Sequence, residues 1–258
     1  MLLKDKVIFV TGAGQGMGRG IAQAVAEAGA HMIVSDLRLE PVQETAKLVE
    51  ASGQRALPVI ADVLDAAVMR QAIQQAVDAF GRLDGWVNNA GVVKMDSALD
   101  ISEEDWAFQF EVNVQGLFVC CQLAAKQMVK QGSGGAIVNI ASNAGKVGYP
   151  NMAAYNASKA AVISLTRSLS TEWAEHHINV NAVCPGGVDT PMLLGVAEWV
   201  SQRIGGDPHE LVKTMKPQQM NRHVQPIEVG RVVAFLLSDQ ARIIRGQAVN
   251  VDGGDTPY

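Results

Sequence analysis

Short apolar runs alternate with longer segments of helical periodicity along almost the whole chain of 258 residues. The runs are rich in Val and Ile, and they are apolar throughout instead of alternating with polar residues. This pattern is typical of strands that are buried on both faces of a parallel sheet. We therefore predict strands over residues 6–11, 31–36, 56–63, 83–91, 135–142, 178–186 and 247–254.

The segments between these runs predict the helices that cover the sheet. Right-handed crossovers between parallel strands give a doubly wound α/β sheet with helices on both faces. No linker-like stretch divides the chain, so we predict a single-domain Rossmann fold with a seven-stranded parallel sheet over residues 1–258. The expected helices cover residues 17–29, 40–51, 65–80, 102–131 and 153–177.

The segment 187–225 breaks this alternation. It is rich in Met, Gln, Gly and Pro, and we expect it to be irregular. A segment of this length is usually a lid or a binding element and not an ordinary loop. We therefore predict a substrate lid at about 187–225.

Composition and charge exclude several classes of protein. The chain has 21 Lys and Arg against 26 Asp and Glu, a net charge of −5, and no basic block, so we expect no nucleic-acid partner. No apolar run is long enough to cross a membrane, and no secretory signal is apparent at the start. Three cysteines in apolar surroundings favour a reducing cytoplasm over a disulfide framework. The histidines lack metal-ligand spacing, so we expect no metal.

A glycine-rich turn, TGAGQGMG, follows the first predicted strand and opens the first helix. Free backbone amides at the start of a helix bind anions, and glycine allows a pyrophosphate to approach the backbone. Gly12, Gly16 and Gly18 do not have the spacing of the general GxGxxG fingerprint. A purely structural turn is the alternative interpretation.

Polar residues stand at the ends of the next three strands, which is where an open α/β sheet binds its ligands. Asp36 ends the second strand, Asp62 follows the third, and NNAG (88–91) follows the fourth. A carboxylate at the position of Asp36 accepts hydrogen bonds from an adenosine ribose and repels a 2′-phosphate, so NAD is favoured over NADP. Arg38 opposes this assignment, and a turn role for Asp36 is the alternative.

The stretch YNASK places Tyr155 and Lys159 one helical turn apart. Oxidation of an alcohol requires a base for the hydroxyl proton, and a nearby ammonium lowers the pKa of a tyrosine. Ser142, at the end of the fifth strand, is placed to hydrogen-bond the substrate oxygen. The alternative is that Tyr155 and Lys159 are only helix surface.

Together, TGAGQGMG, NNAG, Ser142, YNASK and CPGGVDT resemble the short-chain dehydrogenase/reductase family over essentially the whole chain. That family consists of NAD(P)-dependent oxidoreductases with a Rossmann fold. The resemblance implies a catalytic tetrad of Asn113, Ser142, Tyr155 and Lys159, with Asn113 holding a water that connects Lys159 to solvent. It implies that the cofactor is contacted by Gly12, Gln15, Gly16, Met17 and Gly18 at the pyrophosphate, Asp36 at the ribose, Asp62 and Val63 at the adenine, Asn89, Ala90 and Gly91 at the second ribose, and Tyr155, Lys159, Pro185, Gly186, Val188 and Thr190 at the nicotinamide.

The substrate is predicted less closely than the cofactor. The lid resembles in length and placement that of family members acting on polyols, vicinal diols or acetoin, and an NAD preference suits alcohol oxidation. We therefore favour an NAD-dependent polyol or secondary-alcohol dehydrogenase acting on a small-molecule alcohol or ketone. The residues expected to contact the substrate are Ser142, Asn143, Tyr149, Tyr155, Gly187 and Met192.

Two other functions are weighed against this one. The first is a 3-oxoacyl thioester reductase, which would more often use NADPH. The second is a non-enzymatic binding protein on the same fold, which the intact tetrad and glycine turn oppose. The apolar helices over 102–131 and 153–177 and the C-terminal stretch 251–258 resemble the interfaces of the family, which implies a homotetramer.

Overall fold

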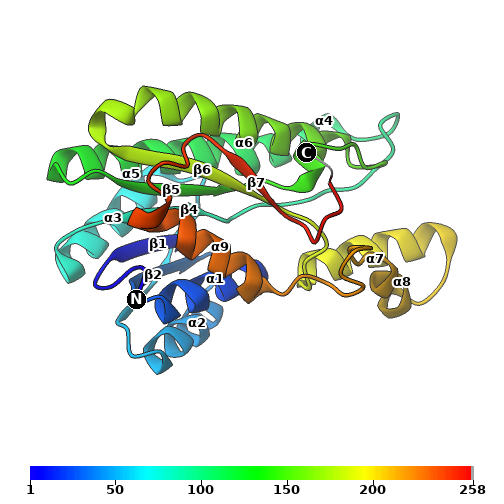
Figure 1. Cartoon of the computed structure of the whole chain (residues 1–258). Coiled ribbons are helices and arrows are strands. Elements are labelled where there is room, and N and C mark those ends of the chain that lie inside the picture. The colour runs from blue at the N-terminus through cyan, green and yellow to red at the C-terminus, as the bar shows by residue number, and fades with distance from the viewer. Residues whose placement is uncertain (257–258) are drawn as a thin grey trace.

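The computed structural model describes residues 1–256 and places one parallel sheet between two layers of helices (Figure 1). Within these residues the strand order is β3-β2-β1-β4-β5-β6-β7, which confirms the predicted seven-stranded Rossmann-type fold. The direction of winding reverses between β1 and β4, where such folds form their binding crevice. The strands are β1 (Val7–Thr11), β2 (His31–Asp36), β3 (Ala56–Ile60), β4 (Gly85–Asn88), β5 (Gly135–Ile140), β6 (Ile178–Pro185) and β7 (Ala248–Val251).

Each face of the sheet has its own hydrophobic core. Helices α1 (Gly16–Glu27), α2 (Leu39–Ala51) and α9 (Pro226–Leu237) cover one face. Helices α3 (Ala66–Phe80), α5 (Leu117–Gln131) and α6 (Ala153–Glu172) cover the other face (Figure 1). The five central strands are mostly buried between these layers, which explains why their sequences are predominantly apolar, whereas the edge strands β3 and β7 are largely half-buried.

Several boundaries differ from the sequence-based prediction. The strands predicted over 56–63 and 83–91 end earlier, at Ile60 and Asn88, because their last residues form the loops at the carboxyl edge of the sheet. The helix predicted over 153–177 ends at Glu172. The helix predicted over 102–131 consists of α4 (Glu103–Phe110), a π-helical turn (Glu111–Gly116) and α5. Helix α9 was not predicted.

The segment 187–225 is helical, so the prediction of irregular structure was wrong. It contains α7 (Pro191–Ile204) and α8 (Pro208–Thr214), which lie beyond the carboxyl end of the sheet (Figure 1). Each helix has a side-chain cap and a proline in its first turn. Thr190 Oγ1 accepts a hydrogen bond from Leu193 N at 3.4 Å, and the Asp207 carboxylate accepts one from His209 N at 2.9 Å.

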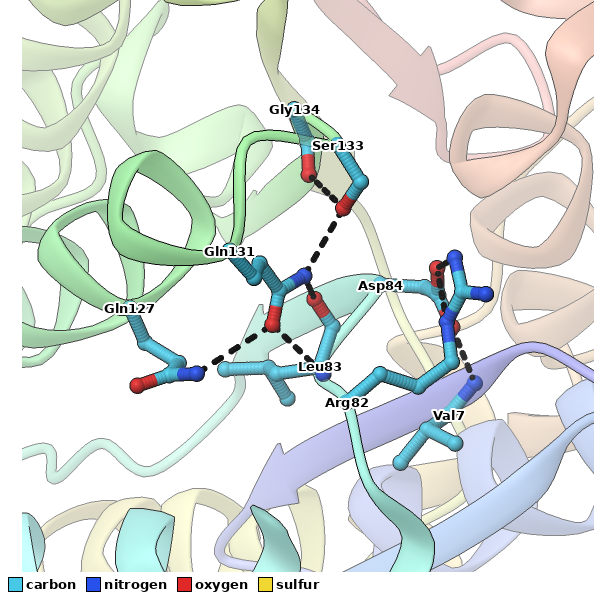
Figure 2. Close-up of polar contacts among 8 residues, drawn as sticks. All are labelled: Val7, Arg82, Leu83, Asp84, Gln127, Gln131, Ser133 and Gly134. Atoms are coloured by element: carbon cyan, nitrogen blue, oxygen red, sulfur yellow. Dashed lines mark hydrogen bonds and ion pairs between the residues drawn. The ribbon is translucent and has the colours of Figure 1, made fainter.

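Polar contacts stabilise the opposite, amino-terminal edge of the sheet (Figure 2). The buried carboxylate of Asp84 accepts a hydrogen bond from Val7 N at 2.9 Å and pairs with Arg82. The Gln131 amide, at the end of α5, donates to Leu83 O at 2.6 Å and accepts from Leu83 N at 3.1 Å. These contacts fix the starts of β1 and β4 and leave the carboxyl edge as the place for a binding site.

Three sequence-based expectations concern disulfides, metal ions and membrane-spanning helices. Cys120, Cys121 and Cys184 are buried and free. Among residues 1–256, no cluster of His, Cys, Asp and Glu side chains could hold a metal ion. In the same residues, no helix combines the length and the apolar character that a membrane crossing requires.

Candidate active site

A cavity of about 1040 Å³ runs along the carboxyl edge of the sheet, from the glycine turn to Tyr155 and on to the side of α7. Almost all residues predicted for the site line it. Asn113 and Lys159 are the exceptions, and both are buried behind the cavity wall. The predicted residues that line the cavity are Gly12, Gln15, Gly16, Met17, Gly18, Asp36, Asp62, Val63, Asn89, Ala90, Gly91, Ser142, Asn143, Tyr149, Tyr155, Pro185, Gly186, Gly187, Val188, Thr190 and Met192.

The glycine turn has a backbone that other residues would not adopt. Gly12 and Gly16 have φ angles of 61° and 52°, and a Cβ on Gly18 would lie 2.1 Å from the Gly12 carbonyl oxygen. Gln15, the N-cap of α1, makes no side-chain hydrogen bond to the helix. The first amides of α1 are therefore not capped by a side chain at the cavity, and they are suited to an anion.

Two neighbours hold this turn in place. The Asn89 amide donates to Thr11 O at 3.0 Å and to Gly12 O at 2.9 Å. The Arg19 guanidinium donates to Gly14 O at 2.6 Å and forms an ion pair of 2.7 Å with Glu44. Asn89 therefore positions the turn, and Arg19, which the sequence analysis did not single out, joins the turn to α2.

The Asp36 carboxylate lies at the end of β2 and is held by backbone amides. Oδ2 accepts a hydrogen bond from Gly14 N at 2.9 Å, and Oδ1 accepts one from Leu37 N at 2.7 Å. Each carboxylate oxygen can accept a second hydrogen bond. The turn role and the ribose role, treated as alternatives from the sequence, are therefore compatible in this geometry.

Ser142, Tyr155 and Lys159 are brought together where β5 and α6 meet. The Lys159 ammonium donates to Ile140 O at 2.9 Å and lies 5.6 Å from the centre of the Tyr155 ring. Ser142 Oγ accepts a hydrogen bond from Ala144 N at 3.1 Å. Ser142 and Tyr155 both line the cavity, whereas Lys159 does not and is buried.

Burial dominates the ionisation of this group. It raises the pKa of Tyr155 above its usual value, and a hydrogen bond with Ser142 offsets only part of that rise. Burial also lowers the pKa of Lys159 to about 8. The sequence analysis expected Lys159 to lower the pKa of Tyr155, but in the protein alone burial has the larger effect. Tyr155 is therefore a protonated phenol near neutral pH, and it needs further positive charge nearby to become a base.

Asn113 lies in the π-helical turn and is bonded on every side. Its amide nitrogen donates to Val92 O at 2.9 Å and to Ser158 Oγ at 3.1 Å, and its oxygen accepts from Val92 N at 2.9 Å. The side chain therefore fixes the loop after β4 to α6. Ser158 is part of this connection. A water-holding role for Asn113 stays a prediction.

The rest of the cavity wall contains residues that sequence reasoning missed. Met95, Phe108 and Val112 come from the loop after β4 and the helical segment that follows it. Val196 and Val200 join Met192 on α7 at intervals of four residues. This spacing is visible in the sequence, but it carries meaning only once the segment is known to be helical.

Comparisons of sequence show similarity over nearly the full chain. Residues 12–256 match the family model described as enoyl-(acyl carrier protein) reductase. An uncharacterized oxidoreductase of Thermotoga maritima is 38% identical over 257 residues, which cover 99% of this chain and 99% of the relative. The 3-oxoacyl-[acyl-carrier-protein] reductase FabG of the same organism is 34% identical over 254 residues, which cover 98% of this chain and 99% of the relative.

Solved structures show the same similarity. Carveol dehydrogenase from Mycobacterium avium, in complex with NAD, superimposes with a TM-score of 0.91 at 29% identity, and the match covers 98% of both chains. Actinorhodin polyketide ketoreductase with NADPH superimposes with a TM-score of 0.92 at 34% identity, again over 98% of both chains. These two enzymes differ in their bound cofactor, so the fold alone does not decide between NAD and NADP.

Proposed function

We propose, because the chain belongs to the short-chain dehydrogenase/reductase family, that it interconverts a secondary alcohol and its ketone with NAD as the cofactor. The family makes the chain an oxidoreductase that acts on CH–OH groups. The observation that carries the proposal is the single cavity that joins the glycine turn and Asp36 to Ser142 and Tyr155.

The residues at the first end of the cavity fit a dinucleotide. The uncapped amides of α1 suit its pyrophosphate, and the Asp36 carboxylate suits a ribose diol. The bound cofactor supplies the acceptor for the hydrogen and the electron pair that the alcohol carbon loses. The proton of the alcohol is a separate requirement, and the protein must provide for it.

Ser142 and Tyr155 provide for that proton at the second end of the cavity. In oxidation, Tyr155 first gives up its own proton, which the positive charges of Lys159 and of a bound NAD⁺ would favour, and its oxygen then takes the hydroxyl proton. In reduction, the protonated phenol gives its proton to the ketone oxygen. Ser142 Oγ is placed to hydrogen-bond the same substrate oxygen and to stabilise its charge. Lys159 adds positive charge behind Tyr155, held in place by Ile140 O.

The role of Tyr155 is tested by the variant Tyr155→Phe, which removes the hydroxyl and keeps the ring. Turnover is expected to fall by roughly 10²–10⁴-fold, because proton transfer loses its group. NADH binding, followed by fluorescence titration, is expected to stay unchanged. Ser168→Ala, an exposed change on the same helix, is the matched control. Retained turnover in Tyr155→Phe would remove this residue from the mechanism.

The preference for NAD is supported by the charges around Asp36. A 2′-phosphate would lie against this carboxylate, and the nearby Arg19 is already paired with Glu44 at 2.7 Å. We expect kcat/KM for NAD to exceed that for NADP by about tenfold or more. Asp36→Asn should lower the ratio of these two kcat/KM values. A wild-type enzyme that prefers NADP would overturn the assignment.

A 3-oxoacyl thioester reductase is the second candidate. The similarity to FabG of Thermotoga maritima favours it, and so does the polyketide ketoreductase with NADPH. Reduction of acetoacetyl thioesters with NADPH, measured beside alcohol oxidation with NAD, separates the two candidates. Activity confined to thioesters would replace the alcohol dehydrogenase proposal.

A homotetramer and a cytoplasmic location complete the proposal. Helices α4 and α5 leave large apolar side chains exposed, namely Trp106 at 41%, Phe118 at 37% and Val129 at 43%, as a surface that packs against another chain would. The free cysteines favour a reducing compartment.

A further inference from the structure

The part of the cavity beyond the catalytic hydroxyls is walled by apolar side chains. On α7, Met192, Val196 and Val200 stand four residues apart, share one face of the helix and line the cavity. We call these three residues the α7 stripe. The three side chains of the α7 stripe present apolar carbon to a ligand and no hydrogen-bonding group.

Other parts of the chain continue the apolar wall. Met95, Phe108 and Val112 contribute from the loop after β4 and the helical segment after it, and Met215 contributes from the end of α8. These residues come from segments far apart in the sequence, and the fold brings them to one cavity. The wall therefore surrounds a ligand with carbon from several elements at once.

Three large side chains are left accessible where they line this cavity. Phe108 is 36% exposed, Tyr149 is 39% exposed and Met192 is 42% exposed. Removing apolar surface from water is favourable, so a ligand that covers these side chains with carbon gains affinity from each of them. A ligand that places hydroxyls against them gains nothing and loses its contacts with water.

Several polar side chains at this end make hydrogen bonds within the protein. The Asn143 amide donates to Tyr149 Oη at 2.8 Å, and the Gln219 amide donates to Gly254 O at 2.7 Å. Asp255 accepts from the backbone amide of Gln218 at 3.2 Å. A polyol requires a partner for every hydroxyl that it buries.

Two further polar residues line the same cavity. Thr214 Oγ1 donates to Leu211 O at 2.7 Å, which occupies its hydrogen. Lys216 is half-buried, and the long stem of a lysine covers apolar surface while its ammonium turns to water. Ser142 and Tyr155 belong to the reacting oxygen, and Tyr149 Oη, which accepts from Asn143, is a further hydroxyl that can donate to a substrate. These polar groups are few beside the apolar side chains of the wall.

We propose that the substrate is a bulky, predominantly apolar secondary alcohol, with hydrocarbon on both sides of the alcohol carbon, and that the α7 stripe selects it. This rests on the proposed function and narrows it away from the polyols that the lid length favoured. The reaction balances as alcohol plus NAD⁺ giving ketone, NADH and a proton. The O–H proton goes to the Tyr155 oxygen, and the carbon-bound hydrogen leaves with its electron pair to NAD⁺.

The test compares kcat/KM at saturating NAD for cyclohexanol, 4-tert-butylcyclohexanol, myo-inositol and sorbitol. We expect 4-tert-butylcyclohexanol to exceed cyclohexanol by about tenfold or more, because each added carbon fills the apolar wall. Myo-inositol and sorbitol are expected to be slower than cyclohexanol. A polyol that is turned over as efficiently as 4-tert-butylcyclohexanol would overturn the proposal.

Variants locate the selectivity on the helix. Val196→Thr together with Val200→Thr keeps the shape of the α7 stripe and adds two hydroxyls. This double variant should lose about tenfold in kcat/KM for 4-tert-butylcyclohexanol and keep its affinity for NADH. Glu198→Gln, an exposed change on the same helix, should behave as the wild type. Equal kcat/KM in the double variant and the wild type would overturn the role of the α7 stripe.

A binding measurement separates this proposal from the proposed function. Calorimetric titration of Tyr155→Phe with NADH bound should show tighter binding of 4-tert-butylcyclohexanone than of dihydroxyacetone. If it does so while the wild type oxidises none of the alcohols, the proposed function fails and the apolar site stands. If dihydroxyacetone binds as tightly, the apolar site fails, whatever the turnover.

Discussion

At the scale of one residue, Lys159 shows that the fold accepts an unfavourable buried charge beside Tyr155. Its ammonium is buried and donates a hydrogen bond to Ile140 O. Burial of a charge is unfavourable, and it lowers the pKa of Lys159 to about 8, whereas an exposed lysine has a pKa of about 10.4. The protein therefore tolerates a costly charge directly behind Tyr155.

This cost predicts a specific dependence of stability on pH. Below pH 8 the folded protein carries the full penalty of the buried ammonium. Between pH 8 and about 10.4 the folded state releases the proton and the unfolded state keeps it, so the penalty disappears as the pH rises. The free energy of unfolding of the wild type, relative to Lys159→Met, should rise by about 3 kcal/mol over this window.

Urea unfolding of both proteins at pH 7, 8, 9 and 10 measures this difference. Subtracting the free energy of unfolding of the variant removes the contributions of other groups that titrate over the same pH range. A difference that stays constant with pH would show that Lys159 is not charged and buried in the folded protein.

Most residues predicted for the site line one cavity, whereas their hydrogen-bond partners were not predicted. Gly12, Asp36 and Tyr155 could be named because turn geometry and proton chemistry restrict the residue type. The amides that hold Asp36, and the contact between Asn113 and Ser158, join segments distant in the chain. No local pattern encodes such contacts, so only the fold reveals them.

At the scale of elements, α1 and α9 cross at two glycines. A Cβ on Gly20 would lie 2.4 Å from Pro226 Cβ, and a Cβ on Gly230 would lie 2.7 Å from both Ala24 Cβ and the Gly20 oxygen. These distances are far below contact, so the two helices meet through their backbones. The crossing holds the start of α1, and with it the glycine turn, against the sheet.

We predict that Gly230→Ala destabilises the protein. Overpacking costs about 1–3 kcal/mol, whereas alanine in a helix gains about 0.5–1 kcal/mol over glycine, so the clash prevails. Gly195→Ala in α7, where a Cβ would meet nothing within 4 Å, is the control and should be neutral or stabilising. Urea midpoints of the two variants give the comparison, and equal midpoints would contradict close packing at the crossing.

The elements that the sequence missed have a physical explanation. Strands buried on both faces are predominantly apolar and are easy to recognise, as β1 shows. Helices α7 and α8 were missed because Gly205 and Gly206 and the prolines around them suggested loops. Thr190 before Pro191 and Asp207 before Pro208 are helix-start signals that were present in the sequence.

At the scale of the whole molecule, the proposed tetramer makes a prediction about α5. Phe118→Glu would place a charge in an apolar interface, where its burial is unfavourable, so the assembly should dissociate to a lower mass in light scattering. Leu48→Glu on α2, also a change of an exposed apolar residue, should leave the mass unchanged. A wild-type protein that has the mass of one chain would refute the tetramer.

For the oligomeric state, the sequence offered only its resemblance to a known family. Apolar residues such as Trp106 on α4 are recognised as unpartnered only when the fold shows which faces are already covered. The second interface predicted over 251–258 ends on Pro257 and Tyr258, which lie outside the described residues. The doubly wound parallel sheet, by contrast, followed from the alternation of strands and helices together with the handedness of crossovers.

The contacts of Gly254 with Gln219 and of Asp255 with Gln218 affect the order in which the cavity wall forms during synthesis of the chain. A chain leaves the ribosome from its first residue to its last, so the segment after α8 gains these supports after β7 has been made. The glycine turn and Asp36 precede them by more than half of the chain. The segment beyond α8 is thus the last part of the cavity wall to gain its supports, because α9, which holds the glycine turn through its crossing with α1, is made before β7.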